Sequence, residues 1–321
     1  MNPLRFGLIG CGQFGAFLAK AAVATGRLRL VAATDSDAAR ADALAAGHGA
    51  TACPDTAALL AHPEVDAVLI ATPPALHMQH AIAAARAGKP VFLEKPMALG
   101  ERACQTINAA VREAGVNLMV GHVLRYFEPY RAIAAAYRAG RLGRALHLSL
   151  WRLEHDFLDI SPWKGQRAVS GGYLYEVAAH ELDWLRAMLG EPTAIQAQIT
   201  RQPSSAHQLE DSVALQMVFP GGTGVHYLGG TGFPRNEHGF QLRFEYATLT
   251  SDQAFDPARV QVASSAGLTV ADLGFGDADP YALELNAWLD SLQAGTPPPI
   301  TGEDAARTVA LIEAAYRAAG W

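Results

Sequence analysis

The chain has 321 residues, of which 50% are hydrophobic and only 17% are charged, a composition that excludes a disordered or collagen-like protein. At about 100 to 200 residues per domain, this length predicts two domains. The 31 acidic and 25 basic residues give a net charge of −6, and because no large basic cluster is present we expect no nucleic-acid partner.

The N-terminus and the cysteines indicate the cellular compartment. The first apolar stretch is broken at once by glycines, unlike the longer apolar region of a signal peptide. No other run reaches the roughly 18 apolar residues that cross a bilayer, so we expect no membrane partner. Cys11, Cys53 and Cys104 lie far apart without a Cys-x-x-Cys pair, which favours the reducing cytoplasm over a disulfide framework.

Up to about residue 120, short apolar runs alternate with alanine-rich helical stretches. Such runs are typical of strands buried on both faces, and the helices between them predict a parallel sheet covered on both sides. The runs are residues 6–9, 30–33, 67–70, 91–93 and 118–120. They end at Gly10, Asp35, Thr72, Glu94 and Gly121. These residues lie at the carboxyl ends of the strands, where open α/β sheets bind their ligands.

After residue 121 the pattern becomes that of an antiparallel sheet. Leu146, Leu148 and Leu150 alternate with His147, Ser149 and Trp151, which predicts a half-covered strand. A second alternating run, turn residues at 220–223 and a third run predict a hairpin over 213–228. Further strands are expected near residues 194–200, 241–251 and 259–262, and helices at 171–189, 281–294 and from 302. We therefore expect an α/β chain with a doubly wound parallel sheet in residues 1–122 and a mostly antiparallel sheet with helices in residues 123–321.

A glycine-rich segment follows the first predicted strand and opens a helix. Gly10, Gly12 and Gly15 permit a tight turn, close approach of backbone N–H groups to a pyrophosphate, and close packing of helix on strand. Asp35 ends the second strand 20 residues after Gly15, where a carboxylate accepts hydrogen bonds from both ribose hydroxyls of an adenosine. Spacing and context together predict a dinucleotide site.

The same aspartate favours NAD over NADP. A carboxylate at residue 35 would lie against the 2′-phosphate of NADP, and Asp37 adds a second negative charge. Arg40 is the only cation nearby, and it is typical of a solvated helix residue. NAD is thus the expected cofactor, and NADP is the less favoured one.

Three further segments narrow the prediction. They are residues 71–77, the tripeptide Glu94-Lys95-Pro96, and residues 171–183. The last segment begins with a Gly-Gly pair, contains Glu176 and His180, and ends at Asp183. In this order, and together with the glycine loop, they resemble the Gfo/Idh/MocA oxidoreductases, the family of glucose-fructose oxidoreductase and inositol dehydrogenase. The resemblance covers nearly the whole chain.

The resemblance implies a fold, a reaction and an assembly. The fold is a Rossmann domain followed by an α+β domain with a large open sheet, and one face of that sheet usually joins subunits, so a homodimer or homotetramer is expected. The reaction is that of an NAD-dependent dehydrogenase acting on CH–OH groups, which transfers a hydride between nicotinamide and a hydroxyl or carbonyl carbon. Sugars, cyclitols and sugar derivatives are the implied substrates, and a cis bond is implied before Pro96.

The family pattern also implies roles for single residues. It places Lys95 beside the nicotinamide, His180 as the acid/base and Glu94 near the nicotinamide ribose. The chemistry agrees, because an imidazole with a pKa near 6.5 suits proton transfer and an ammonium group stabilises an alkoxide. On a regular helix Glu176, His180 and Asp183 share one face, so the carboxylates can orient the imidazole. The residues expected to hold the cofactor are Gly10, Gly12, Gln13, Phe14, Gly15, Asp35, Thr72, Pro73, His77, Glu94 and Lys95.

The chain departs from the family pattern at one point. Many members carry aspartate where this chain has Glu176, and Ala178 replaces a glycine of the usual motif. The substitution leaves open whether the mechanism changes. Two other functions also stay open: an NAD-dependent enzyme that cleaves glycosides by transient oxidation and elimination, and a non-catalytic NAD-binding regulator.

Several polar residues are candidates for binding the substrate. His122 and Arg125 follow the last parallel strand and can line the cleft between domains, although Arg125 suits an interdomain salt bridge equally well. Arg152, Trp163 and Lys164 lie in or beside a polar stretch whose aromatic and charged groups suit a sugar, and a simple surface loop is the alternative. The full set is His122, Arg125, Arg152, Trp163, Lys164 and Asp183.

A metal site is not expected. His77 and His80 stand three residues apart, but no third ligand has suitable spacing. The face that carries His147 and Trp151 is expected on the open sheet, where apolar surface marks a subunit contact.

Overall fold

The computed structural model of this chain describes residues 2–155, 161–202, 205 and 207–321. Its packing divides the chain into two compact units. Unit 1 comprises Met1–Val123 and Ala278–Val309, and unit 2 comprises Leu124–Asp277 and Ala310–Trp321. The main difference from the expected division is that residues 278–309, expected in the second domain, pack with the first; the first boundary differs by one residue, Val123.

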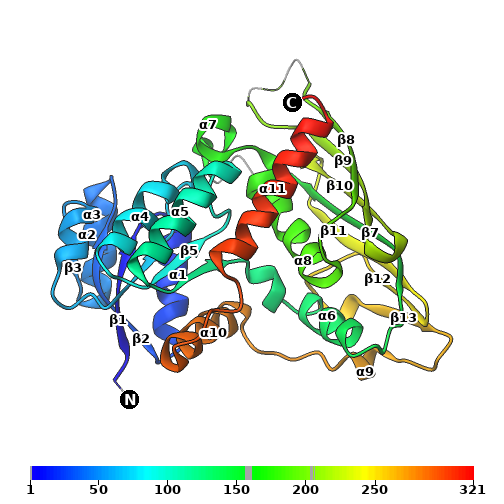
Figure 1. Cartoon of the computed structure of the whole chain (residues 1–321), viewed down its shortest axis with the longest axis horizontal. Helices are drawn as coiled ribbons and strands as arrows, with labels where there is room; N and C mark the ends of the chain where they lie inside the picture. The colour runs from blue at the N-terminus through cyan, green and yellow to red at the C-terminus, as the bar shows by residue number, and fades with distance from the viewer. Residues whose placement is uncertain (1, 156–160, 203–204, 206) are drawn as a thin grey trace. The chain divides into compact units, whose positions relative to one another are not determined.

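Unit 1 is built on the predicted parallel sheet. Its six strands lie in the order β3-β2-β1-β4-β5-β6, which is the doubly wound Rossmann arrangement expected from the sequence. Strands β1, β2, β3 and β5 are labelled in Figure 1. The strands are β1 (Leu4–Ile9), β2 (Leu28–Thr34), β3 (Thr51–Ala52), β4 (Ala67–Ile70), β5 (Val91–Glu94) and β6 (Leu118–Gly121). All four residues of β4 are 0% exposed, which explains why the central runs are apolar without alternation. The chain order reverses between β1 and β4, where sheets of this kind bind their ligands.

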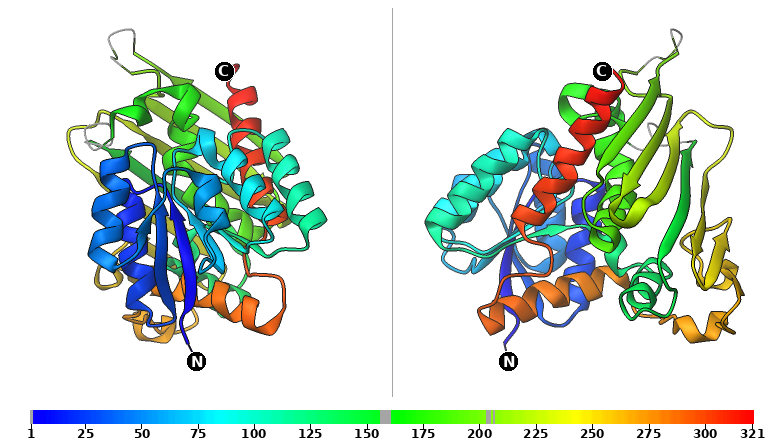
Figure 2. Two further views of the ribbon diagram at one scale, coloured as in Figure 1. Left: turned by 90° about the vertical axis from the view of Figure 1, so that its left-hand side faces the viewer. Right: turned by 45° about the vertical axis from the view of Figure 1, so that its right-hand side comes forward.

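Helices cover both faces of this sheet, with α4 and α5 on one face and α1 and α10 on the other (Figure 2). They are α1 (Gln13–Ala24), α2 (Ala38–His48), α3 (Thr56–Ala61), α4 (His77–Arg86), α5 (Glu101–Ala114) and α10 (Pro280–Ala294), with a 3₁₀ turn η1 (Pro74–Leu76).

Helix α10 belongs to unit 1 because its apolar side is buried there. Trp288 is 0% exposed, and its ring centroid lies 5.6 Å from that of Phe92 on β5. The indole N–H of Trp288 donates a hydrogen bond of 3.1 Å to the side-chain oxygen of Asn117. These partners lie far apart along the chain, so local sequence patterns gave no sign of the contact.

Unit 2 is built on a seven-stranded sheet in the order β13-β12-β11-β7-β10-β9-β8. The β7–β10 pair is parallel and the other pairs are antiparallel, as the alternating patterns predicted. The strands are β7 (Ala145–Glu154), β8 (Ala194–Thr200), β9 (Ser212–Phe219), β10 (Thr223–Thr231), β11 (Glu237–Phe244), β12 (Ala247–Ser251) and β13 (Gln261–Ser264). The predicted hairpin is β9–β10, while the single run expected at 241–251 is divided between β11 and β12.

The two faces of this sheet differ in burial. Helices α6 and α8 lie along one face (Figure 1), and the side chains of Leu148 and Leu150 are buried on the matching side of β7. Leu146 has the same parity but is 46% exposed at the start of the strand. The opposite face carries His147 and Trp151, both only half-buried. We call it the open face of the sheet.

The helical elements of the remaining chain are α6 (Tyr130–Arg138), α7 (Arg167–Ser170), α8 (Ala179–Leu189), α9 (Val270–Leu273) and α11 (Gly302–Ala318). Short 3₁₀ or π turns are η2 (Val123–Tyr126), η3 (Pro162–Gly165), η4 (Leu174–Ala178), η5 (Pro220–Gly222) and η6 (Pro257–Arg259). Among the described residues, none of the helices has the length and apolar character needed to span a bilayer.

Candidate functional site

The glycine loop has the geometry of a phosphate cradle. Gly10 has a φ of +97°, and a Cβ there would lie 2.7 Å from the carbonyl oxygen of Ala71. A Cβ at Gly15 would lie only 1.9 Å from the carbonyl oxygen of Gly10. At Gly12, in contrast, a Cβ would meet nothing within 4 Å, so the backbone is open to a ligand. No side chain caps the start of α1, which leaves the N–H groups of its first turn available to an anion.

The carboxylate of Asp35 is tied to this loop. Its Oδ2 accepts a hydrogen bond of 2.7 Å from the backbone N–H of Cys11, and its Oδ1 accepts one of 2.9 Å from that of Asp37. Arg40 pairs with Asp37 at 3.2 Å, and its side chain is 60% exposed. The side chain of Asp35 thus lies fixed at the end of β2, while the nearby cation Arg40 is already paired with Asp37.

Gln13 and Phe14, also expected at the cofactor, begin α1 and are both exposed. The ring of Phe14 lies 5.7 Å from that of Phe17 and 6.2 Å from that of Tyr281 on α10. The three rings form an exposed aromatic group next to the glycine loop.

The loops that follow β4 and β5 are joined by His77. Its imidazole is fully buried, with Nδ1 2.8 Å from the carbonyl oxygen of Pro96 and Nε2 2.8 Å from that of Thr72. Burial lowers the pKa of His77 to about 4, so the neutral ring donates to one of the two carbonyls at a time. The side chain therefore holds together two loops at this edge of the sheet. The hydroxyl of Thr72 is buried and has no hydrogen-bond partner among the described residues, so a bound dinucleotide could use it. Pro73 precedes η1.

Glu94 is the last residue of β5, and Lys95 follows it directly. The Glu94 side chain is buried, and its Oε2 accepts a hydrogen bond of 3.2 Å from the backbone N–H of Lys95. The Lys95–Pro96 bond is cis, as the family resemblance implied. A Cβ at Gly121 on β6 would lie 3.0 Å from Glu94 Oε1, so glycine makes room for this carboxylate. His122 comes next and is 1% exposed.

In unit 2, Glu176 and His180 lie on two different kinds of helix. Residues Leu174–Ala178 form a π-helical turn, which leads directly into α8. Glu176 is buried on the π turn, whereas His180 is half-exposed in the first turn of α8. Because a π turn holds more residues than an α turn, the spacing of four does not place Glu176 and His180 as a regular helix would. Of the three residues expected to share one face of a regular helix, only His180 and Asp183 lie on the same α-helix, α8. Glu176 lies on the π turn, a kind of turn that is frequent at functional sites.

Of the substrate candidates, Lys164 lies near Glu176, and Trp163 lies beside Lys164. Lys164 Nζ is 3.9 Å from Glu176 Oε2, and it also lies 6.0 Å from the ring centroid of Trp163. Both residues belong to the 3₁₀ turn η3 in the predicted polar stretch 154–170. Residues 156–160 of that stretch lie outside the described residues.

Arg125 and Asp183 are paired with each other. Arg125 Nε lies 2.6 Å from Asp183 Oδ2 and Nη2 lies 2.7 Å from Oδ1, a two-pronged ion pair with a fully buried carboxylate. Both residues belong to unit 2, so this ion pair is not the interdomain salt bridge that was one of the two interpretations of Arg125.

Arg152 lies in a buried group of charges. Its Nε is 2.8 Å from Glu154 Oε1, and its Nη1 is 3.3 Å from Glu181 Oε1. Burial raises the pKa of Glu181. Burial also opposes ionisation of Glu154, but His238 and Arg152 lower the pKa of that carboxyl to about 2. Arg152 therefore neutralises buried carboxylates, a role that the sequence did not suggest.

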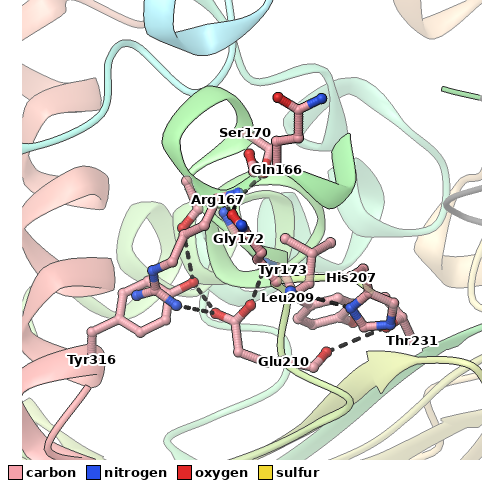
Figure 3. Close-up of polar contacts among 12 residues, drawn as sticks. Gln166, Arg167, Ser170, Gly172, Tyr173, His207, Leu209, Glu210, Thr231 and Tyr316 are labelled. Atoms are coloured by element: carbon pink, nitrogen blue, oxygen red, sulfur yellow. Dashed lines mark hydrogen bonds and ion pairs between the residues drawn. The ribbon is translucent and has the colours of Figure 1, made fainter. Parts of the chain in front are cut away.

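Two buried residues, Glu210 and Tyr316, and the partly exposed Arg167 form a polar group that the sequence did not predict. Arg167, Glu210 and Tyr316 meet next to residues 171–173, where the chain enters the π turn (Figure 3). Among these three residues, Glu210 lies just before an alternating strand. A charged residue in that position is too common to be recognised as part of a site. Among the described residues, no group of three or more His, Cys, Asp or Glu side chains could hold a metal ion.

Residues 4–122 match a family model described as "Oxidoreductase family, NAD-binding Rossmann fold", and residues 130–250 match the model of the "GFO/IDH/MocA C-terminal domain". Inositol 2-dehydrogenase 3 of Saccharopolyspora erythraea is 31% identical over 300 residues, which are 91% of this chain and 86% of that protein. The 2,7-anhydro-N-acetylneuraminate hydratase of Escherichia coli is 29% identical over 73% of this chain and 64% of its own length. The chain also matches half the length of an uncharacterized oxidoreductase of Streptococcus pneumoniae, at 34% identity over 58% of this chain.

Among solved structures, the WlbA dehydrogenase from Bordetella pertussis in complex with NADH and UDP-GlcNAcA has the same fold. The TM-score is 0.88 at 24% identity, over 99% of this chain and 96% of that one.

Proposed function

We propose, since the chain belongs to the Gfo/Idh/MocA family of oxidoreductases, that it transfers a hydride between NAD and a hydroxyl or carbonyl carbon of a sugar, a cyclitol or a sugar derivative. Residues 4–122 form an NAD-binding Rossmann domain. The observation that carries the proposal is the position of Lys95, which directly follows the inner strand β5 at the same edge of the sheet as the glycine loop. The inositol dehydrogenase relative supports the substrate class.

We assign the proton chemistry to His180 and Lys95. Bound NAD supplies the hydride acceptor. The half-exposed imidazole of His180 removes the hydroxyl proton, and the ammonium group of Lys95 stabilises the negative charge that develops on the oxygen. The carboxylate of Glu176, paired with Lys164 at 3.9 Å, orients a polar group of the substrate.

The residues that would hold the dinucleotide are those of the expected set in unit 1. The open backbone at Gly12, the uncapped start of α1 and the unpartnered hydroxyl of Thr72 fit a phosphate-bearing ligand. His122, Arg125, Arg152, Trp163, Lys164 and Asp183 remain the candidates for contact with the substrate. Arg125 and Asp183 are paired with each other, and Arg152 is paired with Glu154 and Glu181, so these three would meet the substrate as members of ion pairs.

NAD is proposed over NADP because the charge of Asp35 lies at the end of β2 and Arg40 is already paired. We expect the dissociation constant of NADP to exceed that of NAD by at least about fivefold, since one close like-charge contact is worth about 1 kcal/mol or more. Fluorescence titration of the protein with each dinucleotide measures both constants. Equal affinities, or tighter binding of NADP, would contradict the assignment.

The catalytic roles are tested by Lys95→Ala and His180→Ala. We expect each to lower kcat by about 10²- to 10⁴-fold, the range for loss of an acid/base or charge-stabilising group. The measurement follows NADH absorbance with NAD and a panel of sugars and cyclitols, myo-inositol among them. Lys20→Ala on the exposed side of α1 is the matched control. Unchanged turnover in both catalytic variants, with NAD still bound, would refute the assignment.

A second candidate function is favoured by one relative. The Escherichia coli relative is named a hydratase, a reaction class without net change in redox state. A glycoside-cleaving enzyme that oxidises and reduces its substrate in one cycle would likewise release sugar without accumulating NADH. Product analysis of the same panel separates this function from net oxidation. Tight NAD binding with no turnover of any substrate would instead indicate a non-catalytic regulator. The presence of both Lys95 and His180 argues against a regulator.

We also propose a cytoplasmic location and a homodimer or homotetramer. The first is supported by Cys11, Cys53 and Cys104, which are all buried free thiols. The second is supported by the apolar side chains on the open face, among them Val218 and Leu228, which are 43% and 45% exposed.

A further inference from the structure

A buried carboxylate contacts the segment that leads into the π turn (Figure 3). Glu210 lies in the loop before β9 and is 0% exposed. Its Oε2 accepts a hydrogen bond of 2.9 Å from the backbone N–H of Tyr173, the residue just before η4. Its Oε1 accepts a hydrogen bond from the hydroxyl of Tyr316 on α11. Both oxygens are therefore used to join three separate parts of unit 2.

Arg167 balances the charge of this carboxylate. Its Nη1 lies 3.8 Å from Glu210 Oε1. The guanidinium group also lies over two aromatic rings, 4.4 Å from the centroid of Tyr316 and 4.9 Å from that of Trp321. We call Arg167, Glu210 and Tyr316 the Glu210 anchor.

The anchor fits closely around the backbone before the π turn. Gly172 has a φ of +108°, and a Cβ there would lie 2.8 Å from both oxygens of Glu210 and 2.4 Å from the hydroxyl of Tyr316. The same hydroxyl is 3.2 Å from the carbonyl oxygen of Gly171. Just beyond, the ring of Tyr175 stacks on that of Tyr316, with centroids 6.1 Å apart and planes at 22°. The anchor thus contacts the chain at successive residues up to the one that precedes Glu176.

Stability alone does not explain a carboxyl group at this place. A buried carboxyl group must recover a large loss of hydration, and well-packed apolar side chains are often at least as stabilising. What a carboxyl group with directed hydrogen bonds adds is a defined orientation of the groups it binds. Here the bound group is the first backbone N–H of the helical segment that carries Glu176 and His180.

We propose that Glu210 is a positioning residue, held by Arg167 and Tyr316, which sets the start of the π turn and thereby the orientation of Glu176 and His180. The inference rests on the proposed function, because the orientation of His180 affects turnover only if His180 transfers the proton. Glu210 and Tyr316 themselves need not touch the substrate.

Two conservative variants test the proposal. Tyr316→Phe removes one hydroxyl and keeps the aromatic stack, and Glu210→Gln keeps an acceptor for the Tyr173 N–H but removes the charge that faces Arg167. We expect both to lower kcat by about 10- to 100-fold, the size of effect that a small misplacement of a catalytic group produces, with no change in the dissociation constant of NAD. The control is Tyr137→Phe on α6, whose ring packs against Phe244. The assay uses NAD with myo-inositol or, if that is not oxidised, the panel substrate with the highest kcat/KM.

Hydrogen exchange gives a second measurement that does not depend on turnover. We expect the amides of residues 171–180 to exchange faster in Tyr316→Phe than in the wild type or in Tyr137→Phe, while the amides of β9 and β10 remain unchanged. If Glu210→Gln does not fold, Tyr316→Phe decides the question.

The outcomes are distinct. Wild-type kcat in a folded Tyr316→Phe or Glu210→Gln protein would overturn the proposal, as would unchanged exchange of residues 171–180. A wild-type protein that turns over nothing in the panel would defeat the proposed function, and the exchange measurement alone would then decide whether Glu210 sets the π turn.

Discussion

The buried imidazole of His77 makes the stability of unit 1 depend on pH. Burial lowers the pKa of His77 to about 4 in the folded chain, whereas the unfolded chain has the ordinary value near 6.5. The unfolded state therefore binds a proton first as the pH falls. Stability is fully present above about pH 6.5 and is lost progressively down to about pH 4, by about 3 kcal/mol in all.

Urea unfolding at pH 6.5 and pH 5.0 checks this expectation with His77→Gln. Between these values the wild type should lose about 2 kcal/mol more than the variant, which lacks the titrating group. His48→Gln, at a half-exposed histidine of α2, serves as the control and should behave as the wild type does. Equal losses in the wild type and His77→Gln would show that His77 is not the source of the effect.

At the residue scale, the sequence predicts contacts that are local and misses those that are not. Gly10, Gly15 and Asp35 were found because a turn, a helix start and a strand end follow one another within a short stretch. The hydrogen bond between Tyr316 and Glu210 joins residues 106 positions apart, and no local pattern records it. The ion pair of Arg125 with Asp183, 58 positions away in the same unit, was not predicted either, because the sequence suggested only a residue lining the cleft or an interdomain salt bridge.

At the scale of elements, the entry to the π turn should be far more sensitive to substitution than an ordinary glycine turn. Gly172→Ala introduces a Cβ within 2.8 Å of both Glu210 oxygens at a φ of +108°. Gly140→Ala at the end of α6 has a φ of +72° but nothing within 4 Å of the new Cβ. The second substitution should cost about 1 kcal/mol and the first at least about 3 kcal/mol, because overpacking adds to backbone strain.

Chemical unfolding of both variants measures the difference in their free energies of unfolding. If the π turn is displaced in Gly172→Ala, its kcat should fall as well. Similar losses in the two variants would mean that the loop containing Glu210 moves away without cost.

The elements that the sequence predicted are those with a simple period. Continuous apolar runs identified β1, β2, β4, β5 and β6, and alternation identified β7 and the β9–β10 hairpin. The two-residue strand β3 is too short to produce a pattern. The π turn at Leu174–Ala178 is equally hidden, because a stretch that is buried at every position looks the same in either kind of helix.

At the scale of the whole molecule, the open face predicts self-association. Val218 on β9 and Leu228 on β10 are nearly half exposed there, and lysine at both positions should place charge in the contact. We expect sedimentation velocity to show a dimer or tetramer for the wild type and a monomer for Val218→Lys/Leu228→Lys. Leu76→Lys, at an exposed leucine of unit 1, should leave the assembly intact. A monomeric wild type, or a double variant that still assembles, would contradict the proposed interface.

The return of α10 to unit 1 has a consequence for how the protein is made. All six strands of the parallel sheet leave the ribosome before residues 124–277, whereas α10 and the first part of α11 leave after them. Phe92 therefore cannot be covered by Trp288 until unit 2 has been almost entirely translated. Although domains generally fold in order from the N-terminus, this nucleotide-binding domain is the first to begin and cannot be completed until the chain is nearly finished.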